Sequence, residues 1–259
     1  MEYGIITQSV VSVRETPSEK SQMVNQLLFG DLFLIKSKKA DWYLIETVYD
    51  NCEGWVFGMQ ATVIAESFFQ KAAESENHFV HSLYGMAKGK NRYLPLLRGA
   101  QLPLWEEGNF QIEEEEYYYK KAVHLPPSSP TGSDIINVAK GYLEAPYLWG
   151  GRSPFGIDSS GLVQVVFKMN GIRLPRDASH QVENGEQILF VEAAHAGDIA
   201  FFESNDGTIN HSGIILNGNR IIHAWGKVRI DSLDHQGIFN NELKAYTHRL
   251  RVVKSVLNR

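Results

Sequence analysis

Residues 146–161 read P-Y-L-W-G-G-R-S-P-F-G-I-D-S-S-G and lead into the apolar run L-V-Q-V-V-F-K-M at 162–169. Glycines and prolines crowd the first part and then stop, which predicts an irregular loop, a turn at Gly156 and a helix from about Ser159. Asp158 or Ser159 can cap that helix, because a short side-chain oxygen accepts from the free N–H groups of a first turn. The partial positive charge at a helix N-terminus also lowers the pKa of a thiol placed there.

Several separated motifs occur in a fixed order around this helix start. The run G-I-D-S-S-G-L-V-Q at 156–164 is preceded by P-Y-L-W-G-G and followed by G-I-R-L-P-R-D-A-S-H-Q at 171–181. This order resembles the NlpC/P60 cysteine peptidases, and within that family it is most similar to the γ-D-glutamyl-L-diamino-acid endopeptidases with N-terminal bacterial SH3-like domains. The departure from the family pattern that matters most lies at position 159, because Ser159 stands where the family has its nucleophilic cysteine.

Composition narrows the class of protein. The 259 residues are 43% hydrophobic and 21% charged, as in an ordinary soluble globular protein, and the net charge of −5 argues against a nucleic-acid partner. No basic segment followed by an apolar one opens the chain, and no apolar run approaches 18 residues, so we expect no signal peptide and no membrane span. The single cysteine, Cys52, fits a reducing compartment, and we expect a cytoplasmic location.

Turn signals and linkers divide the chain into three expected domains. Many short strands at close spacing predict a small β-barrel over 1–62, which resembles an SH3-like domain, and weaker signals of the same kind predict a second one over 63–125. The segment L-P-P-S-S-P-T-G-S at 125–133 reads as a linker, because clustered prolines exclude a helix interior or a central strand. The third domain then covers 126–259.

The third domain shows helices first and strands afterwards. A helix capped by Ser133 or Asp134 should end near residue 144, and a short helix should lie within 175–185. Strands are expected at 197–202, 210–216 and 220–225, with a two-residue Asn-Gly turn at 217–218. This order predicts an α+β fold, and the family resemblance implies a papain-like core.

The resemblance implies a catalytic triad of the residue at position 159, His211 and His223. In a cysteine form His211 would take the thiol proton, and His223 would hold His211 in the useful tautomer. A metal site is disfavoured, because no third ligand at a recognisable spacing accompanies the two histidines, and no cofactor is expected.

Ser159 has three explanations: an engineered exchange made to trap substrate, a natural loss of activity, or a working serine hydrolase. A serine hydroxyl is not appreciably ionised at neutral pH, so a site built around a thiolate–imidazolium pair would lose its nucleophile. Every other motif position is retained. We therefore interpret Ser159 as an engineered Cys→Ser exchange that inactivates an active parent enzyme.

The resemblance also implies a substrate. Family members use residues beside the nucleophile and in the R-D motif to bind murein peptides with a free N-terminal L-Ala, and an acidic residue and a tyrosine of the first SH3-like domain close the amine site. By rough position Gln22 and Phe57 stand at those two places, which departs from the family pattern. The positions that match are Asp158, Ser160, Asp177, Ala178, Tyr147 and Trp149.

The expected reaction is hydrolysis of the γ-D-glutamyl-L-diamino-acid bond of murein peptides during cell-wall recycling. SH3-like domains that wall off one end of the groove would exclude glycan-linked substrates. Two alternatives stay open at this point. A natural serine chain could bind murein peptides without cutting them, and an acyltransferase could use the same core, because acyl transfer and hydrolysis share a thioester intermediate.

Overall fold

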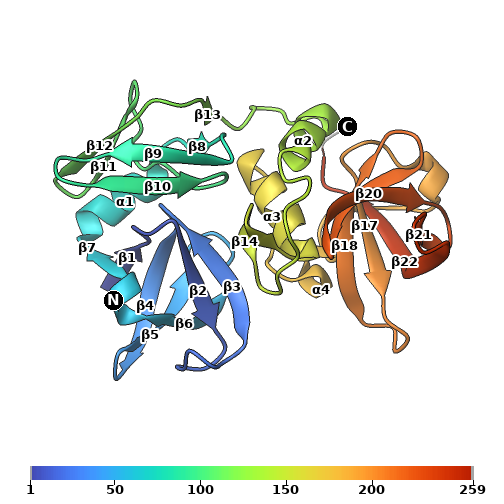
Figure 1. Cartoon of the computed structure of the whole chain (residues 1–259), viewed down its shortest axis with the longest axis horizontal. Helices are drawn as coiled ribbons and strands as arrows, with labels where there is room; N and C mark the ends of the chain where they lie inside the picture. The colour runs from blue at the N-terminus through green and yellow to red at the C-terminus, as the bar shows by residue number, and fades with distance from the viewer. Residues whose placement is uncertain (1, 258–259) are drawn as a thin grey trace. The chain divides into compact units, whose positions relative to one another are not determined.

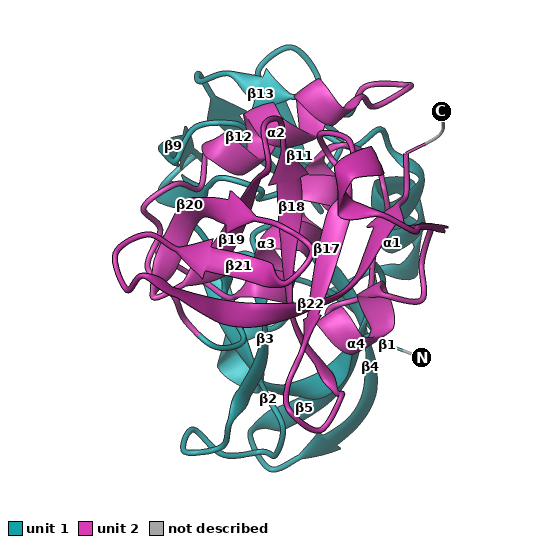
Figure 2. Cartoon of the chain, turned by 90° about the vertical axis from the view of Figure 1, so that its right-hand side faces the viewer, with its two compact units in different colours: residues 1–126, 149–154 teal, residues 127–148, 155–259 magenta. Residues whose placement is uncertain are grey.

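The computed structural model describes residues 2–257, whose helices and strands are labelled in Figure 1. The chain divides into two compact units, which Figure 2 shows in different colours. The N-terminal unit comprises residues 2–126 and 149–154, and the C-terminal unit comprises 127–148 and 155–257. The segment 149–154 therefore groups with the N-terminal unit, although the chain on both sides of it belongs to the other unit. The division into domains at residues 62 and 125 stays a prediction.

The first part of the N-terminal unit is a seven-stranded sheet in the order β3-β2-β6-β5-β4-β1-β7. Alternating burial along β2 places Val11 and Val13 in a hydrophobic core, the pattern of a strand with one face covered. The strands are β1 (Glu2–Ile5), β2 (Val10–Arg14), β3 (Met23–Leu28), β4 (Leu32–Lys39), β5 (Trp42–Thr47), β6 (Glu53–Phe57) and β7 (Thr62–Ile64).

The second part of this unit adds a helix that the sequence analysis did not predict. Helix α1 (Glu66–Glu74) buries Phe68 and Ala72, which lie four residues apart and so share one helix face. A four-stranded sheet follows in the order β10-β9-β12-β11, and β13 pairs with β8. The bounds are β8 (Phe79–Val80), β9 (Tyr84–Lys88), β10 (Tyr93–Leu97), β11 (Asn109–Ile112), β12 (Glu115–Tyr119), β13 (Val123–His124) and, in the inserted segment, β14 (Arg152–Ser153).

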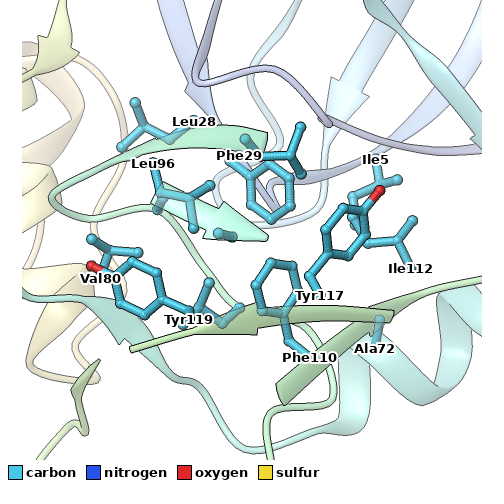
Figure 3. Close-up of a cluster of buried hydrophobic side chains, with 14 of the residues drawn as sticks. Ile5, Leu28, Phe29, Ala72, Val80, Leu96, Phe110, Ile112, Tyr117 and Tyr119 are labelled. Carbon is cyan, nitrogen blue, oxygen red and sulfur yellow. The ribbon is translucent and has the colours of Figure 1, made fainter. Parts of the chain in front are cut away.

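One hydrophobic cluster draws on both parts of the N-terminal unit (Figure 3). Phe29, from the turn after β3, meets Phe110 of β11 edge-on with ring centroids 5.6 Å apart. Phe110 in turn stacks on Tyr117 of β12 at 5.1 Å. Residues before and after position 62 therefore share a core, and two separate SH3-like domains stay a prediction.

Three helices open the C-terminal unit. Helix α2 (Gly132–Lys140) is capped by Thr131 rather than by Ser133 or Asp134, because Thr131 and Asp134 form a reciprocal capping box, and it ends four residues before the expected position 144. Helix α3 (Ser159–Met169) and the short α4 (Ala178–Gln181) lie where the sequence predicted helices. Within residues 2–257, no helix is long and apolar enough to cross a membrane.

An antiparallel sheet follows the helices, in the order β16-β22-β17-β18-β19-β20-β21. Because β21 also pairs with β22, the six strands from β17 to β22 form a closed ring. Helix α3 packs against β18 and β19 of this ring. The strands are β15 (Gly156–Ile157), β16 (Glu186–Ile188), β17 (Ile199–Glu203), β18 (Ile209–Leu216), β19 (Arg220–Trp225), β20 (Lys227–Leu233), β21 (Gly237–Asn240) and β22 (Ala245–Ser255).

The turn between β18 and β19 differs from its prediction by one residue. A two-residue Asn-Gly turn at 217–218 was expected, and this is wrong, because the register pairs Leu216 with Arg220 and leaves three residues in the loop. Gly218 and Asn219 both adopt left-handed backbone, with φ of 74° and 55°. A left-handed residue at the end of a three-residue loop is a common way to close a hairpin.

This one-residue difference decides which face of the sheet carries the two histidines. Directly paired residues of an antiparallel sheet share a face, and successive residues alternate. With Leu216 opposite Arg220, His211 and His223 lie on the same face, whereas a two-residue loop would place them on opposite faces. A glycine is needed at position 213, because a Cβ there would lie 2.7 Å from Ile221 Cδ1 and 3.0 Å from the Cβ of His223.

Candidate functional site

Position 159 is the first residue of α3, and it is buried. The N-cap of the helix is Asp158, whose Oδ1 accepts from the backbone N–H of Gly161 at 2.7 Å. The helix N-terminus predicted from the sequence is therefore present, with Asp158 as its cap. Since α3 packs against β18 and β19, it lies on the same strands that carry His211 and His223.

A buried arginine that the sequence analysis did not single out holds this helix start. Arg176 donates from Nη1 to Oδ1 and from Nη2 to Oδ2 of Asp158, at 3.0 and 2.7 Å, and Nη1 also donates to Ser160 Oγ at 2.9 Å. Both members of the pair are more than 90% buried. A bidentate guanidinium–carboxylate contact fixes both partners in one geometry. The only sequence signal for it was the position of Arg176 directly before Asp177 in the R-D motif.

Gln181, the last residue of α4, links the helix start to the histidine strand. Its Nε2 donates to the carbonyl oxygens of Ser160 and Pro175, both at 2.9 Å, and its Oε1 accepts from Ser212 Oγ at 3.3 Å. Gln181 is completely buried. The residue after position 159 is thereby connected to the residue after His211 through one side chain.

The two histidines form a hydrogen-bonded chain that ends on a carboxylate. His211 Nε2 lies 2.9 Å from His223 Nδ1, and His223 Nε2 lies 3.1 Å from Asp231 Oδ2. Arg229 donates to both oxygens of Asp231, from Nε at 2.7 Å and from Nη2 at 3.1 Å. Burial by itself would raise the pKa of Asp231, but the hydrogen bonds from His223 and Arg229 outweigh it and lower the pKa below the ordinary value. Asp231 is therefore an anion at neutral pH.

The charge of Asp231 assigns the tautomers along the chain. A carboxylate only accepts, so His223 must donate to it from Nε2 and keep a lone pair on Nδ1. That lone pair accepts from the N–H on Nε2 of His211, which leaves Nδ1 of His211 as the nitrogen able to take a proton. Burial, together with the neighbouring imidazoles of His248 and His223, lowers the pKa of His211 well below its usual range, so the ring is neutral at pH 7.

Asp231 and Arg229 were missed from the sequence, although a signal existed. In β20 the residues V-R-I-D alternate, and the register places Arg229 directly opposite His223, with Asp231 two residues further on the same face. To place Arg229 and Asp231 beside His223, one must know how β19 pairs with β20. The local sequence, two short strands joined by a single glycine, does not determine this register.

A third histidine, also missed, stacks on the first. The ring of His248 from β22 stacks on that of His211, with centroids 4.0 Å apart and an angle of 26° between the ring planes. It meets His223 edge-on at 5.6 Å and Trp225 edge-on at 5.7 Å. Burial first, and the nearby imidazole of His223 second, lower the pKa of His248 to about 4. Nothing in the local sequence T-H-R-L-R marks this residue, because it reaches the site through the closure of the ring by β22.

The remaining residues implied by the resemblance occupy different environments. Tyr147 is about two-fifths exposed, and burial and the charge of Asp158 raise the pKa of its hydroxyl against the opposing charge of Arg176. Asp177 is exposed and stands at the N-cap of α4 without a side-chain cap bond, whereas Ala178 is buried. Trp149 is exposed and belongs to the N-terminal unit. The binding roles of all these residues stay predictions.

Replacing Asp231 by asparagine tests the tautomer assignment. An asparagine amide can donate to Nε2 of His223, which would reverse the direction of the hydrogen-bond chain and take the lone pair from Nδ1 of His211. In a Ser159→Cys background we expect kcat for peptide hydrolysis to fall by about 100-fold or more, as wrong-tautomer variants of other triads do. Steady-state kinetics measure this.

Glu242→Gln is the matched control, because Glu242 contacts the same Arg229 from the solvent side and is largely exposed. It should change kcat by less than about twofold. An Asp231→Asn protein with near-normal kcat and an unchanged circular-dichroism spectrum would show that the carboxylate does not set the tautomers.

Comparison with known proteins supports a family for this unit. Residues 144–247 match the model of the NlpC/P60 family. The chain is 28% identical over 214 residues to a γ-D-glutamyl-L-lysine dipeptidyl-peptidase of Bacillus subtilis. This alignment covers 77% of the present chain and 71% of the relative. It is also 24% identical over 261 residues to dipeptidyl-peptidase 6 of Lysinibacillus sphaericus, and this alignment covers 90% of the present chain and 92% of the relative.

Solved structures agree on the fold of the chain. An NlpC/P60 family protein from Bacillus cereus superposes with a TM-score of 0.84 at 20% sequence identity, over 99% of this chain and all of the other. An NlpC/P60 endopeptidase from Photobacterium damselae gives a TM-score of 0.73 at 18% identity, over 96% of this chain and 70% of the other. At such identities the likeness establishes the fold alone.

Proposed function

We propose that the chain has the site of a peptidase that hydrolyses the γ-D-glutamyl-L-diamino-acid bond of murein peptides with a free N-terminal L-Ala, in the recycling of cell-wall peptides. The observation that carries the proposal is the buried chain His211–His223–Asp231 on the strands that pack against the helix beginning at position 159. The names of the two relatives, a γ-D-glutamyl-L-lysine dipeptidyl-peptidase and a dipeptidyl-peptidase, support the substrate class.

The proposed reaction needs a thiol at position 159. Nδ1 of His211 takes the proton of the thiol, and the thiolate attacks the γ-carbonyl carbon of the D-glutamyl residue. The imidazolium then gives the proton to the departing α-amine of the diamino acid, leaving a thioester. Water, deprotonated by His211, hydrolyses the thioester and restores the thiol. His223 and Asp231 hold His211 in the tautomer that both proton transfers require.

Ser159 makes the present chain an inactive form of this site. A serine hydroxyl loses its proton far less readily than a thiol, and the low pKa of His211 makes it a weak base for that task. The chain should still bind murein peptides, because a hydroxyl changes the shape of the site little. Ser159 is also the observation that favours the second candidate function, a murein-peptide-binding protein without catalysis.

The free α-amine of the substrate is a cation and needs an acceptor. We propose Asp158, Ser160, Asp177 and Tyr147 as the polar groups that meet this end of the peptide, with Ala178 and Trp149 against its apolar part. Asp158 already accepts two hydrogen bonds from Arg176, so the amine would share this carboxylate. Asp177 is exposed and has no side-chain cap bond, which makes it the more accessible carboxylate.

The test compares the chain with its Ser159→Cys variant on L-Ala-γ-D-Glu-L-Lys and on the diaminopimelate analogue, with products identified by mass spectrometry. We expect the thiol form alone to release L-Ala-γ-D-Glu and the free diamino acid. The N-acetylated peptide and the α-linked isomer are the matched control substrates, and both should resist cleavage. Transfer of the dipeptide to an added amine would identify an acyltransferase instead.

A binding titration of the Ser159 chain separates the two candidates. Peptide binding without cleavage by either form would favour the binding protein. If both proteins are folded and yet show no binding and no cleavage of the peptide, that result contradicts both candidate functions.

A further inference from the structure

The histidine cluster of the C-terminal unit has the composition of a metal site. His211, His223 and His248 each offer a ring nitrogen, and these three atoms lie within 4.8 Å of one another. Three imidazoles are a ligand set that borderline divalent cations such as Zn²⁺ prefer, and four-coordinate zinc with three histidines keeps a position for water. A metal site could not be expected from the sequence alone, because the third ligand comes from β22, 25 residues after His223.

Two of the three rings already have the outer contacts typical of metal-bound histidines. His223 donates from Nε2 to the Asp231 carboxylate, which leaves Nδ1 as the ligand atom. A carboxylate behind a histidine orients the ring and makes it a better donor to a metal. Arg229 holds this carboxylate in place from the other side.

His248 has its own outer contact. Its Nδ1 lies 2.9 Å from Thr247 Oγ1, and that hydroxyl donates to the Ile238 carbonyl oxygen at 3.4 Å. Because the hydroxyl proton is used there, the oxygen accepts from the ring, and Nε2 of His248 keeps its lone pair. His248 is also only partly buried, so a hydrated cation can reach it from solvent.

We propose that His211, His223 and His248 bind a divalent cation of the zinc class, with water as the fourth ligand. The cation would take the place of the proton shared by His211 Nε2 and His223 Nδ1. Those atoms are 2.9 Å apart and would have to separate to about 3.3 Å, the spacing of two nitrogens on tetrahedral zinc. The stacked ring of His248 would turn so that its lone pair points at the same centre.

This inference goes beyond the proposed function and does not depend on it, because metal binding needs neither a thiol nor a substrate. It does predict an antagonism. The metal occupies the nitrogens that order the catalytic tautomers, so the metal-bound state and the peptidase state of the site exclude each other.

The experiment is a calorimetric titration of the chain with Zn²⁺, using protein without an affinity tag and carrying Cys52→Ser, so that the single thiol does not bind metal. We expect one equivalent to bind. His248→Gln should weaken the binding more than tenfold, and Asp231→Asn, which leaves all three ligands in place, should weaken it by about 10- to 100-fold. His235→Gln, at an exposed histidine of the same unit, is the control and should leave the affinity unchanged.

Co²⁺ gives a second measurement that does not depend on any variant folding. A four-coordinate Co²⁺ complex with imidazole ligands absorbs strongly in the visible range, whereas cobalt on scattered surface side chains stays octahedral and pale. A visible band at one equivalent, displaced by Zn²⁺, supports the site. No Zn²⁺ binding, a pale Co²⁺ spectrum, or Zn²⁺ binding that His248→Gln leaves unchanged would overturn the proposal.

Discussion

His211→Ala, made in the Ser159→Cys protein, is expected to lower kcat/KM on L-Ala-γ-D-Glu-L-Lys by about 10⁴- to 10⁶-fold, as loss of the base does in other nucleophile–base pairs. His211 is the only ring of the chain His211–His223–Asp231 with a nitrogen left to take the nucleophile's proton. Without it the thiol has no base, and the departing amine has no proton donor. Steady-state and single-turnover kinetics with the tripeptide measure the effect.

His235→Ala is the matched control, since His235 is an exposed histidine of the same unit, in the turn between β20 and β21. Its kcat/KM should stay within about twofold of the parent. If the His211→Ala protein kept more than a tenth of the parental activity, His211 would not be the base.

Arg176→Met should have the largest effect on stability. The substitution removes the two hydrogen bonds that Asp158 accepts from Arg176 and leaves a carboxylate buried without a cation at the start of α3. Breaking one side of a buried ion pair costs about 3–5 kcal/mol, because the other charge stays out of water. Urea unfolding followed by circular dichroism, with the two units treated as separate transitions, measures the loss.

The double variant Asp158→Asn, Arg176→Met tests whether the unpaired Asp158 charge causes the loss of stability in Arg176→Met. Asparagine still caps a helix but carries no charge, so the double variant should be more stable than Arg176→Met alone. Lys168→Met, which removes a different buried cation, one that belongs to α3 itself, serves as a comparison that leaves the Asp158–Arg176 pair intact. A loss below about 1 kcal/mol in Arg176→Met would mean that Asp158 is solvated or neutral, and would refute the ion-pair account.

Local features of the site could be predicted from the sequence because their causes are local. Asp158 precedes an uninterrupted apolar run, so the cap and the start of α3 follow from neighbouring residues alone. Gly171 lies two residues after the last residue of α3 and has a φ of 79°, as a helix stop requires. The C-cap and N-cap chemistry of this helix therefore needed no knowledge of the rest of the fold.

Features that depend on pairing between strands could not be predicted in this way. The hairpin that carries His211 and His223 was predicted, but the predicted loop was one residue too short. Because side chains alternate along a strand, that error of one residue would place the two histidines on opposite faces of the sheet. Asp231 and His248 join the site only because β20 pairs with β19 and β22 closes the ring onto β17 and β21. No spacing in the sequence encodes those contacts.

Helix α1 shows a different kind of failure. Its sequence E-S-F-F-Q-K-A-A-E contains good helix formers and places Phe68 and Ala72 on one face, so the signal was present. Because a second barrel was expected over 63–125, strands were predicted in this region. Helix propensity alone would have identified α1.

The most direct test of the account is the pKa of the thiol introduced by Ser159→Cys, measured in a Cys52→Ser background from the pH dependence of alkylation by iodoacetamide. In the thiol form His211 accepts the proton of the introduced cysteine, and the resulting imidazolium and the helix N-terminus together stabilise the thiolate, so we expect a thiol pKa at least about two units below the ordinary value of 8.5. His211→Ala should raise the pKa of this thiol most of the way back to the ordinary value. A thiol that titrates at 8.5 or above, and is indifferent to His211→Ala, would contradict the claim that this fold activates a nucleophile at position 159.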